Sequence, residues 1–572
     1  MRILKFGGSS VGTPERISKV IDILKTYSER GIHIGVVFSA FQTVTDRLIA
    51  LSNKTVQRND SYKDDLEALK QIHFDAVNYL LKSKSDKVAS GKKVMNLIVE
   101  LEEILHGIFL IQELTPRTLD YIMSFGERLS CTIISEAMNA RGFATEFLDS
   151  RKVIKTDKSF GNAKVDFELT DKNISEYFSA HPKIQIITGF IGSTENGDTT
   201  TLGRGGSDYS ASILGAALEA EEIEIWTDVD GILTADPRKV TDAFSLKAVT
   251  YEEAMEMSHF GAKVIHPPTM KPALKKKIKI RIKNTFNPSH EGTLIADKND
   301  TGELTVKGIS SIDDISLLQI TGSGMVGVVG ISSRLFGALA KAKINIILIT
   351  QASSEHSICL AVLPQNGPMA KEVIEEEFRW EIRDGMIDEV VIEPEMSIIA
   401  VVGEDMKHTP AVSGKIFQSL GKNGINIIAI AQGSSELNVS LVIQKPFLKK
   451  ALNVLHASLF LSKDRQKTLN IFLVGTGLVG GALLKIISER SDFIAEKIHA
   501  KLKVIGLINI DSMLIDEKGI ELKDWKGTLA TNGLSPDVDK FIDQMKQLKL
   551  PNSVLVDCTA SDSVVKNYFR EK

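Results

Sequence analysis

The chain has few cysteines and no long apolar run. Its three cysteines, Cys131, Cys359 and Cys558, are far apart in 572 residues, which excludes a disulfide framework and a cysteine-rich zinc site. No stretch of about 18 apolar residues occurs, so no transmembrane helix is expected. The chain enters a glycine motif directly, without the apolar region of a signal peptide, and we therefore expect a cytoplasmic protein.

Charge is also balanced. Lysine and arginine number 69, aspartate and glutamate number 73, and the net charge is −4, so binding to nucleic acid or to a membrane is not expected. Hydrophobic residues make up 43% and charged residues 25%, which is ordinary globular composition. At about 150 residues per domain the length corresponds to three or four domains.

The first segment reads as a strand, a glycine loop, a helix and a second strand. Residues 2–6 are apolar, glycines and serines fill 7–12, Thr13 and Pro14 suit a helix start, and Ile32–Phe38 is a second buried strand. This order opens an α/β fold with parallel strands.

A glycine turn before a helix presents backbone N–H groups to an anion. Gly7 and Gly8 allow close approach to phosphate oxygens, Ser9 lies beside them, and Lys5 adds a positive charge. By itself the loop is also compatible with a tight turn and a surface lysine. It is not a P-loop, and no protein-kinase motif set occurs.

Five further motifs place glycine beside polar or charged residues, and each is predicted to follow a strand. Ligands of open α/β sheets bind at such strand ends. The motifs are SFGERLS (124–130), TGFIG (188–192), LGRGGSD (202–208), IEIWTDVDGILTADPR (223–238) and HFGAKVIHPP (259–268).

Together with KFGGSSVG (5–12), and in this order, these motifs resemble the aspartate kinases of the amino-acid kinase family over residues 1–305. The resemblance implies an amino-acid kinase fold with a central, mainly parallel sheet. It also implies transfer of the ATP γ-phosphoryl group to the β-carboxylate of L-aspartate. A carboxylate is already a nucleophile, so the reaction needs positioning and charge neutralisation rather than a base.

The resemblance assigns roles to individual residues. Lys5, Asp208 and Lys263 would be catalytic. Aspartate would be held by Ser39, Thr45, Glu127, Arg204 and Ser207, and ATP by Lys5, Gly7, Gly8, Ser9, Thr227, Asp228, Arg238 and Lys263. No metal-ligating cluster of His and Cys is present, so we expect no resident metal and only Mg²⁺ bound with ATP through oxygens.

Some of these residues have plainer interpretations. Asp228 and Arg238 could be turn residues, and His259 and His266 are interpreted as local structural residues. Residues 50–115 are predicted to be helical and to help cover the aspartate site. The basic run 271–283 alternates with isoleucine and is predicted to be a half-buried strand rather than a nucleic-acid patch.

The second segment contains an internal repeat. Residues 344–363 (INIILITQASSEHSICLAVL) resemble residues 425–443 (INIIAIAQGSSELNVSLVI), with Gln351 and Gln432 separated by 432 − 351 = 81 positions. Each copy follows a predicted helix and ends in a strand hairpin, and the order strand, helix, strand, strand, helix, strand is ferredoxin-like. Residues 313–462 resemble the paired ACT domains that follow aspartate kinases.

That second resemblance implies feedback inhibition by an end-product amino acid. The patterns TQASSEHSI and AQGSSELNV are closest to the threonine-sensitive type, so threonine is expected rather than lysine. The candidate effector contacts are Asn345, Gln351, Asn426 and Gln432. These amides could instead cap strand ends or pair across a subunit interface. Because paired ACT domains often join subunits, a homo-oligomer is expected.

The third segment carries a dinucleotide motif. Gly475, Gly477 and Gly480 form G-x-G-x-x-G between a predicted strand at 469–474 and a helix. A further strand is predicted at 502–508, and no acidic residue is clearly placed at its end, which leaves NAD and NADP both open.

Residues 468–572 resemble the start of homoserine dehydrogenase as a partial Rossmann domain. The whole chain resembles threonine-sensitive bifunctional aspartokinase/homoserine dehydrogenases. In that family the chain continues past this point, so we expect a truncated chain with an incomplete dehydrogenase site, where NADP could still bind.

Three alternatives remain at this point. A kinase acting on glutamate or a nucleotide is disfavoured by the ACT repeat and by the setting of Glu127 and Arg204. A catalytically silent amino-acid sensor is disfavoured because Lys5, Asp208 and Lys263 are all present. A working dehydrogenase is disfavoured by the missing C-terminal part.

Overall fold

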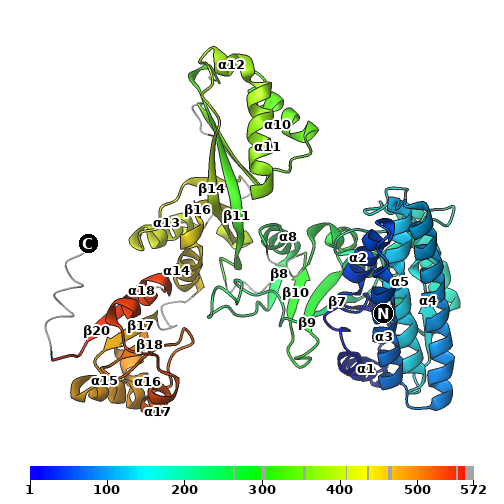
Figure 1. Cartoon of the computed structure of the whole chain (residues 1–572), viewed down its shortest axis with the longest axis horizontal. Coiled ribbons are helices and arrows are strands. Elements are labelled where there is room, and N and C mark those ends of the chain that lie inside the picture. Colours follow the sequence, from blue (N-terminus) through cyan, green and yellow to red (C-terminus); the bar gives the residue numbers. More distant parts are fainter. Residues whose placement is uncertain are drawn as a thin grey trace. The chain divides into compact units, whose positions relative to one another are not determined.

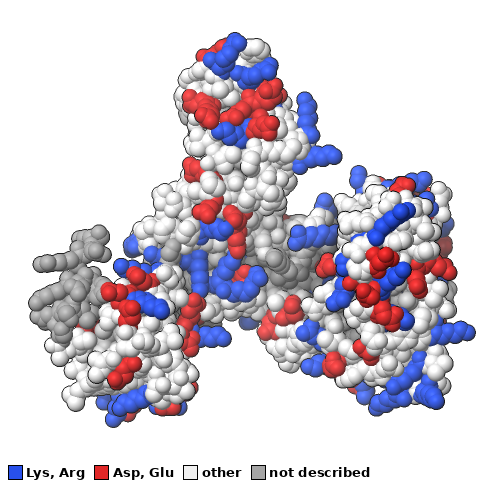
Figure 2. Space-filling model, in the orientation of Figure 1, with Lys and Arg blue, Asp and Glu red and all other residues white. Residues whose placement is uncertain are grey.

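The computed structural model forms two units (Figure 1). It describes residues 1–261, 265–297, 304–325, 328–351, 356–407, 409–433, 437–460, 467–498, 500–548, 550 and 552–560. The first unit contains residues 1–233 and 245–303, and the second contains 234–244 and 304–572. On the face that Figure 2 shows, acidic and basic side chains are interspersed, in keeping with the balanced charge.

An eight-stranded sheet in the order β3-β4-β2-β1-β7-β9-β10-β8 organises the first unit. All of its strand pairs are parallel except β9 with β10, which confirms the prediction of a mainly parallel sheet. Its strands are β1 (Arg2–Phe6), β2 (Ile34–Phe38), β3 (Thr145–Leu148), β4 (Ile184–Thr188), β7 (Glu222–Thr227), β8 (Ala248–Thr250), β9 (Lys279–Asn284) and β10 (Thr293–Ala296).

Helices follow most of these strands, and a short hairpin of β5 (Ile191–Ser193) and β6 (Thr199–Thr201) stands apart from the sheet. The helices are α1 (Pro14–Glu29), α2 (Val44–Val56), α3 (Tyr62–Leu80), α4 (Lys84–Ile111), α5 (Pro116–Asn139), α6 (Phe167–Ala180), α7 (Gly206–Ala217), α8 (Tyr251–His259) and α9 (Lys271–Lys276). No helix of the described residues is long and apolar enough to cross a bilayer.

The start of α1 agrees with the sequence. The Thr13 side chain accepts the N–H of Arg16, and Pro14 occupies the first turn. Gly31, just after the helix, has a φ of 66°, a conformation that favours glycine. The helix therefore begins and ends where its capping residues predict.

Three expectations for this unit were wrong. The basic run 271–283 is a strand only from Lys279, because Lys271–Lys276 form α9. Motif SFGERLS lies in the middle of α5 and not at a strand end. Its glycine has a packing role, since a Cβ on Gly126 would lie 2.8 Å from the Cβ of Ala40. The motif HFGAKVIHPP likewise follows helix α8 rather than a strand.

The ACT repeats of the second unit share one six-stranded sheet in the order β12-β13-β11-β14-β16-β15. Figure 1 shows its two long strands, β11 and β14, side by side. The strands are β11 (Gly308–Thr321), β12 (Leu348–Gln351), β13 (Ser357–Val362), β14 (Val391–Val402), β15 (Ala429–Gln432) and β16 (Asn438–Gln444), and the helices are α10 (Ile331–Lys341), α11 (Gly367–Glu377), α12 (Arg379–Arg383), α13 (Val412–Lys422) and α14 (Leu448–Phe460).

The two repeats exchange strands. Residues 315–319 of β11 pair with 391–396 of β14, whereas residues 308–312 pair with 398–402. The first repeat therefore has the predicted ferredoxin-like order, ending in the first half of β14. The second repeat takes its last strand from the first half of β11, which precedes it in the chain. A local repeat pattern could not predict this exchange.

The C-terminal part forms a four-stranded sheet in the order β19-β18-β17-β20. Strands β18 and β20 are both parallel to β17, and β19 pairs antiparallel with β18. Its strands are β17 (Lys467–Val474), β18 (Ala500–Ile508), β19 (Met513–Ile515) and β20 (Ser553–Asp557), and its helices are α15 (Leu478–Glu489), α16 (Ser491–Ile498), α17 (Trp525–Asn532) and α18 (Val538–Leu548). The three parallel strands and the glycine turn after β17 give the predicted partial Rossmann fold.

Candidate functional site

A cleft of about 390 Å³ opens at the carboxyl ends of the parallel strands in the first unit. The loops after β1, β2 and β4 and the first turns of α2 and α7 contribute to it. This is where a doubly wound sheet binds ligands. Nine residues predicted from the sequence line the cleft: Lys5, Gly8, Ser9, Ser39, Thr45, Glu127, Arg204, Ser207 and Asp208.

Lys5 and Asp208 form an ion pair at the base of the cleft. The Lys5 ammonium lies 2.6 Å from a carboxylate oxygen of Asp208, and both side chains are nearly buried. Strand β1 fixes the lysine, and the first turn of α7 fixes the aspartate. A buried ammonium held in this way is a fixed positive charge that phosphate oxygens can approach.

The glycines beside Lys5 allow this close packing. A Cβ on Gly7 would lie 3.2 Å from the Lys5 Nζ, and a Cβ on Gly8 would lie 3.3 Å from the carbonyl oxygen of Ala40. The Gly7 N–H donates to the carbonyl of Trp226, the penultimate residue of β7. Gly7 therefore anchors the loop, while Gly8 and Ser9 line the cleft.

Glu127 reaches the cleft from α5 and is 3% exposed. Its Oε1 accepts the N–H of Ala40 at 3.1 Å, while Oε2 is buried and has no hydrogen-bond partner. Burial raises the pKa of Glu127 to about 8, although the Ala40 amide acts in the opposite direction. A buried oxygen without a donor is suited to receive one from a ligand.

The other predicted substrate residues line the same cleft. Ser39 donates to the Ser207 hydroxyl at 2.9 Å, which ties the loop after β2 to α7. Thr45 is half-buried in the first turn of α2, and Arg204 is exposed just before α7. The structure thus places a carboxylate, hydroxyls and a guanidinium around one space, a set that complements an α-amino acid.

Some predicted nucleotide residues are not among the described residues that line the cleft. Thr227 ends β7, and its hydroxyl donates to Asp228 at 3.1 Å. Arg238 belongs to the second unit, where its guanidinium binds Asp236 and its side chain is 73% exposed. Lys263 lies outside the described residues. Thr227, Asp228 and Arg238 are not among the residues that line the cleft.

Sequence reasoning missed several residues of the cleft. Gln42 and Thr43 line it, and Thr43 has a φ of 69°. Phe190 also lines it with a φ of 68°, so the sharp turn of TGFIG falls on the phenylalanine and not only on its glycines. Gly189 leaves room for Ser207, because a Cβ on Gly189 would lie 2.7 Å from its Oγ. In the sequence, Gly189 was the one indication that this turn packs closely against other residues of the cleft.

Among the described residues no group of three His, Cys, Asp or Glu side chains could hold a metal ion. Asp208 supplies one carboxylate, already paired with Lys5. Oxygen donors of this kind suit Mg²⁺, whose remaining ligands would come from phosphates and water.

The four amides predicted to contact an effector are all exposed: Asn345, Gln351, Asn426 and Gln432. Gln351 ends β12 and Gln432 ends β15. These two strands meet, because the Thr350 hydroxyl donates to the carbonyl of Ile430 at 2.9 Å. The matching ends of the two repeats therefore lie together in one chain.

The dinucleotide motif has the expected geometry. Gly475 follows β17 with a φ of 90°, and Gly477 precedes α15. A Cβ on Gly480 would lie 1.9 Å from the carbonyl oxygen of Gly475, so only glycine fits. At the end of β18, Asn509 donates to Thr476 at 3.3 Å and accepts the N–H groups of Asp511 and Ser512. Asn509 thus occupies the position, at the end of the second parallel strand, where dinucleotide-binding folds usually have an acidic residue.

Comparison with known proteins agrees with this organisation. Residues 1–284 match the amino acid kinase family, and residues 318–378 and 399–459 each match the ACT domain. The fold and the cleft thus define an amino acid kinase joined to paired ACT domains.

Relatives and solved structures extend the comparison. A bifunctional aspartokinase/homoserine dehydrogenase of Haemophilus influenzae is 36% identical over 572 residues, which are 100% of this chain and 69% of that protein. The chloroplastic bifunctional aspartokinase/homoserine dehydrogenase 2 of Arabidopsis thaliana is 38% identical over 99% of this chain and 62% of its own length.

Escherichia coli aspartokinase III in complex with aspartate and ADP is 28% identical with a TM-score of 0.67, covering 80% of this chain and 100% of its own. The same enzyme in complex with lysine and aspartate has a TM-score of 0.65 at 28% identity, covering 80% and 99%. The chain belongs to the family of bifunctional aspartokinase/homoserine dehydrogenases, and it spans 62–69% of the length of these relatives.

Proposed function

We propose that this chain transfers the γ-phosphoryl group of ATP to the β-carboxylate of L-aspartate. The observation that carries the proposal is one cleft lined both by the Lys5–Asp208 pair and by Glu127, whose buried Oε2 has no hydrogen-bond partner. One part suits phosphate charge and the other suits an α-ammonium group. The E. coli relative that binds aspartate and ADP supports this assignment.

The residues suggest a division of labour. Glu127 binds the α-ammonium of aspartate, and Arg204 binds its α-carboxylate through a bidentate fork. Ser39, Thr45 and Ser207 orient the substrate, and the β-carboxylate attacks the γ-phosphorus in line with the departing ADP. Lys5, with Lys263, offsets the negative charge that develops on the transferred group, and Asp208 holds Lys5 in place.

For the nucleotide, the proposal assigns each residue to a region of ATP rather than to a single atom. Gly7, Gly8 and Ser9 cradle the phosphates, and Thr227, Asp228 and Arg238 lie around the rest of the nucleotide. Mg²⁺ bound with ATP supplies charge neutralisation at the phosphates.

The test is ATP-dependent formation of acyl phosphate from L-aspartate, trapped as the hydroxamate. Glutamate serves as a competing acceptor in the same assay, and release of ADP measures transfer to a nucleoside monophosphate. Turnover with ATP and aspartate, but with neither of the other two acceptors, supports the proposal. Turnover with glutamate would instead assign the chain to another amino-acid kinase activity. A folded protein without turnover would favour a silent amino-acid sensor.

We further propose feedback inhibition by an amino acid, threonine rather than lysine, through Asn345, Gln351, Asn426 and Gln432. The ACT domains and the meeting of β12 with β15 support this.

We also propose a cytoplasmic homo-oligomer joined through the ACT domains, with functional segments at 1–305, 313–462 and 468–572. Parallel assays with threonine and lysine, and the mass in solution by light scattering, test these points.

The glycine turn of the C-terminal part supports a proposal of dinucleotide binding, with NADP as the ligand. Its narrow geometry at Gly475 and Gly480 suits a pyrophosphate at the start of α15. Fluorescence titration with NADPH and NADH tests both the binding and the preference.

A further inference from the structure

The loop that follows β7 runs directly into the core of the second unit. Residues 228–233 belong to the first unit, residues 234–244 to the second, and the chain returns to the first at Ser245. We call residues 234–244 the inserted segment. Residues 228–233 connect this segment to Thr227, the last residue of β7.

The inserted segment is part of the hydrophobic core of the second ACT repeat. Val240 is fully buried and Ala235 nearly so, and both belong to the cluster that contains Ile399 and Leu455. The carbonyl of Thr234 accepts the N–H of Ile309 from β11 at 2.8 Å. The segment therefore moves with this core and not as a free surface loop.

His456 of α14 holds the first residue of the segment. Its Nε2 lies 2.9 Å from the Thr234 hydroxyl, which also accepts the N–H of Phe244 at 3.2 Å. The imidazole is 1% exposed and packs between Phe460, with ring centroids 4.8 Å apart, and Phe244, at 6.1 Å. One buried side chain thus contacts both ends of the inserted segment.

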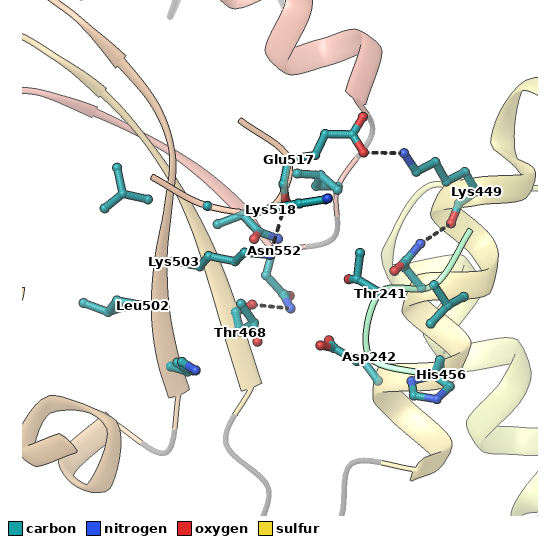
Figure 3. Close-up of a pocket in the computed structure, with 18 of the residues that line it drawn as sticks. Thr241, Asp242, Lys449, His456, Thr468, Leu502, Lys503, Glu517, Lys518 and Asn552 are labelled. Carbon is teal, nitrogen blue, oxygen red and sulfur yellow. Dashed lines mark hydrogen bonds and ion pairs between the residues drawn. The ribbon is translucent and has the colours of Figure 1, made fainter. Parts of the chain in front are cut away.

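Further contacts hold its middle. The Asn453 amide of α14 donates to the carbonyl of Lys239 at 2.8 Å, and the Lys239 ammonium binds Ser311 at 3.0 Å and Asp313. Figure 3 shows Thr241 and Asp242 beside the helix that carries Lys449 and His456. These residues line a polar cavity of about 460 Å³ within the second unit.

The first unit holds the preceding residues just as closely. The carboxylate of Asp230 accepts the amides of Asn284 and Asn287 at 2.9 and 3.0 Å. The N–H of Ile232 donates to the Thr293 hydroxyl at 2.8 Å. Only Leu233 lies between Ile232 and Thr234, so the backbone has little freedom to absorb a displacement of Thr234.

We propose that His456 is a positioning residue for the nucleotide loop and acts through Thr234 and the inserted segment. The second ACT repeat thereby sets the binding of ATP and leaves the aspartate side of the cleft unaffected. The inference rests on the proposed kinase function and specifies how its regulatory part reaches the nucleotide. Couplings of this kind correspond to changes of roughly 2- to 30-fold in affinity.

The experiment compares the full-length Thr234→Val, His456→Ala and His456→Gln variants with wild type. Thr234→Val removes only the hydroxyl, and His456→Gln retains a hydrogen-bonding group. Val240→Ala reduces the packing of the inserted segment in the core of the second ACT repeat. Val362→Ala is the matched control, because Val362 is equally buried in the first ACT repeat. The Michaelis constants for ATP and aspartate are measured separately, together with the melting temperature.

We expect Thr234→Val, His456→Ala and Val240→Ala to raise the KM for ATP by roughly 3- to 10-fold, with the KM for aspartate within about twofold. His456→Gln should restore part of the loss, and Val362→Ala should change neither constant. An unchanged KM for ATP in the three variants, or an equal rise of both constants, would overturn the proposal.

A second readout separates this inference from the kinase assignment. Hydrogen exchange of residues 227–233 is measured in each variant without substrates. Faster exchange in Thr234→Val and His456→Ala, but not in Val362→Ala, supports the inference even if wild type phosphorylates no aspartate. Exchange equal to that of wild type in all variants contradicts it.

Discussion

The Lys5 ammonium and the Asp208 carboxylate lie 2.6 Å apart, one on β1 and the other in the first turn of α7. Each partner stabilises the charge of the other, because a nearly buried lysine needs a counter-charge and a nearly buried aspartate needs a cation. The pair therefore keeps a positive charge in a defined place without requiring a bound nucleotide. A phosphate oxygen that entered the cleft would meet an ammonium whose position is already fixed.

Replacing Lys5 by Met should lower kcat by about 100- to 1,000-fold, the range for loss of one fixed donor to a developing negative charge. The hydroxamate assay measures kcat, and circular dichroism melting reports the fold. Lys19→Met is the control, because Lys19 is an exposed lysine on α1. A Lys5→Met enzyme as fast as the control would remove Lys5 from the mechanism.

Asp208→Asn tests the partner. The amide retains the shape but not the charge, so Lys5 should lose its orientation and kcat should fall by about 100-fold. The melting temperature should fall as well, since the nearly buried Lys5 ammonium loses its counter-charge. A normal kcat would show that Asp208 is not required to hold the lysine.

Glu127 should release a proton when aspartate binds. Its pKa is about 8 in the ligand-free protein because the carboxyl is buried, so it is mostly protonated at pH 7. An α-ammonium group beside it favours the carboxylate, lowers the pKa and expels the proton. Aspartate affinity should therefore increase from pH 6 to 8.

Calorimetry in two buffers of different ionisation enthalpy measures this proton release. Glu127→Gln should abolish the release and weaken aspartate binding, while the KM for ATP stays near that of wild type. Equal apparent enthalpies in both buffers for the wild-type protein would contradict the assignment of Glu127 to the ammonium group.

The same residue predicts a pH dependence of stability. At Glu127 the folded protein binds more protons than the unfolded chain between the ordinary pKa of 4.5 and about 8. The contribution of Glu127 to the free energy of unfolding should therefore decrease as pH rises across this interval. Urea unfolding of ligand-free wild type and Glu127→Gln measures it, and the variant should show a smaller slope. Parallel slopes would mean that Glu127 does not titrate in this range.

The sequence predicted the glycine loop well because its signals are local. Thr13, Pro14 and Gly31 determine where α1 begins and ends, and Lys5 follows from its place at the end of a short apolar strand. Glu127 was identified only through resemblance. It lies in the middle of a helix, and its role depends on Ala40 from another segment.

Other features depended on long-range packing. The strand exchange between β11 and β14 joins residues far apart in sequence, so each repeat read alone suggested an independent domain. Phe190 and Thr43 adopt positive φ angles that residue type does not predict. The basic run from Lys271 begins as a helix because the alternation of isoleucines covers only its second half.

Asp120 should stabilise the loop that leads to Arg204. Its buried carboxylate accepts the N–H groups of Gly161 and Thr201 at 2.9 Å each and the Thr201 hydroxyl at 2.8 Å. Asp120→Ala leaves the buried N–H and hydroxyl of Thr201 without an acceptor and should lower stability by about 2–4 kcal/mol. Asp120→Asn should lose much less, because one amide oxygen can accept both N–H groups while the hydroxyl rotates. Urea unfolding measures both, and equal losses would contradict this hydrogen-bonding role.

Gln432→Ala should weaken inhibition by threonine without changing kcat. Gln432 is exposed at the end of β15, beside the contact of Ile430 with Thr350, and far in sequence from the residues of the cleft. Losing one amide hydrogen bond to an effector corresponds to about 0.5–1.5 kcal/mol, or roughly 2- to 12-fold in the half-inhibitory concentration. Gln351→Ala should act in the same direction, since the repeat places it at the matching strand end. Gln444→Ala is the control, as an exposed glutamine at the end of β16. If Gln432→Ala and Gln444→Ala are inhibited alike, the effector binds elsewhere.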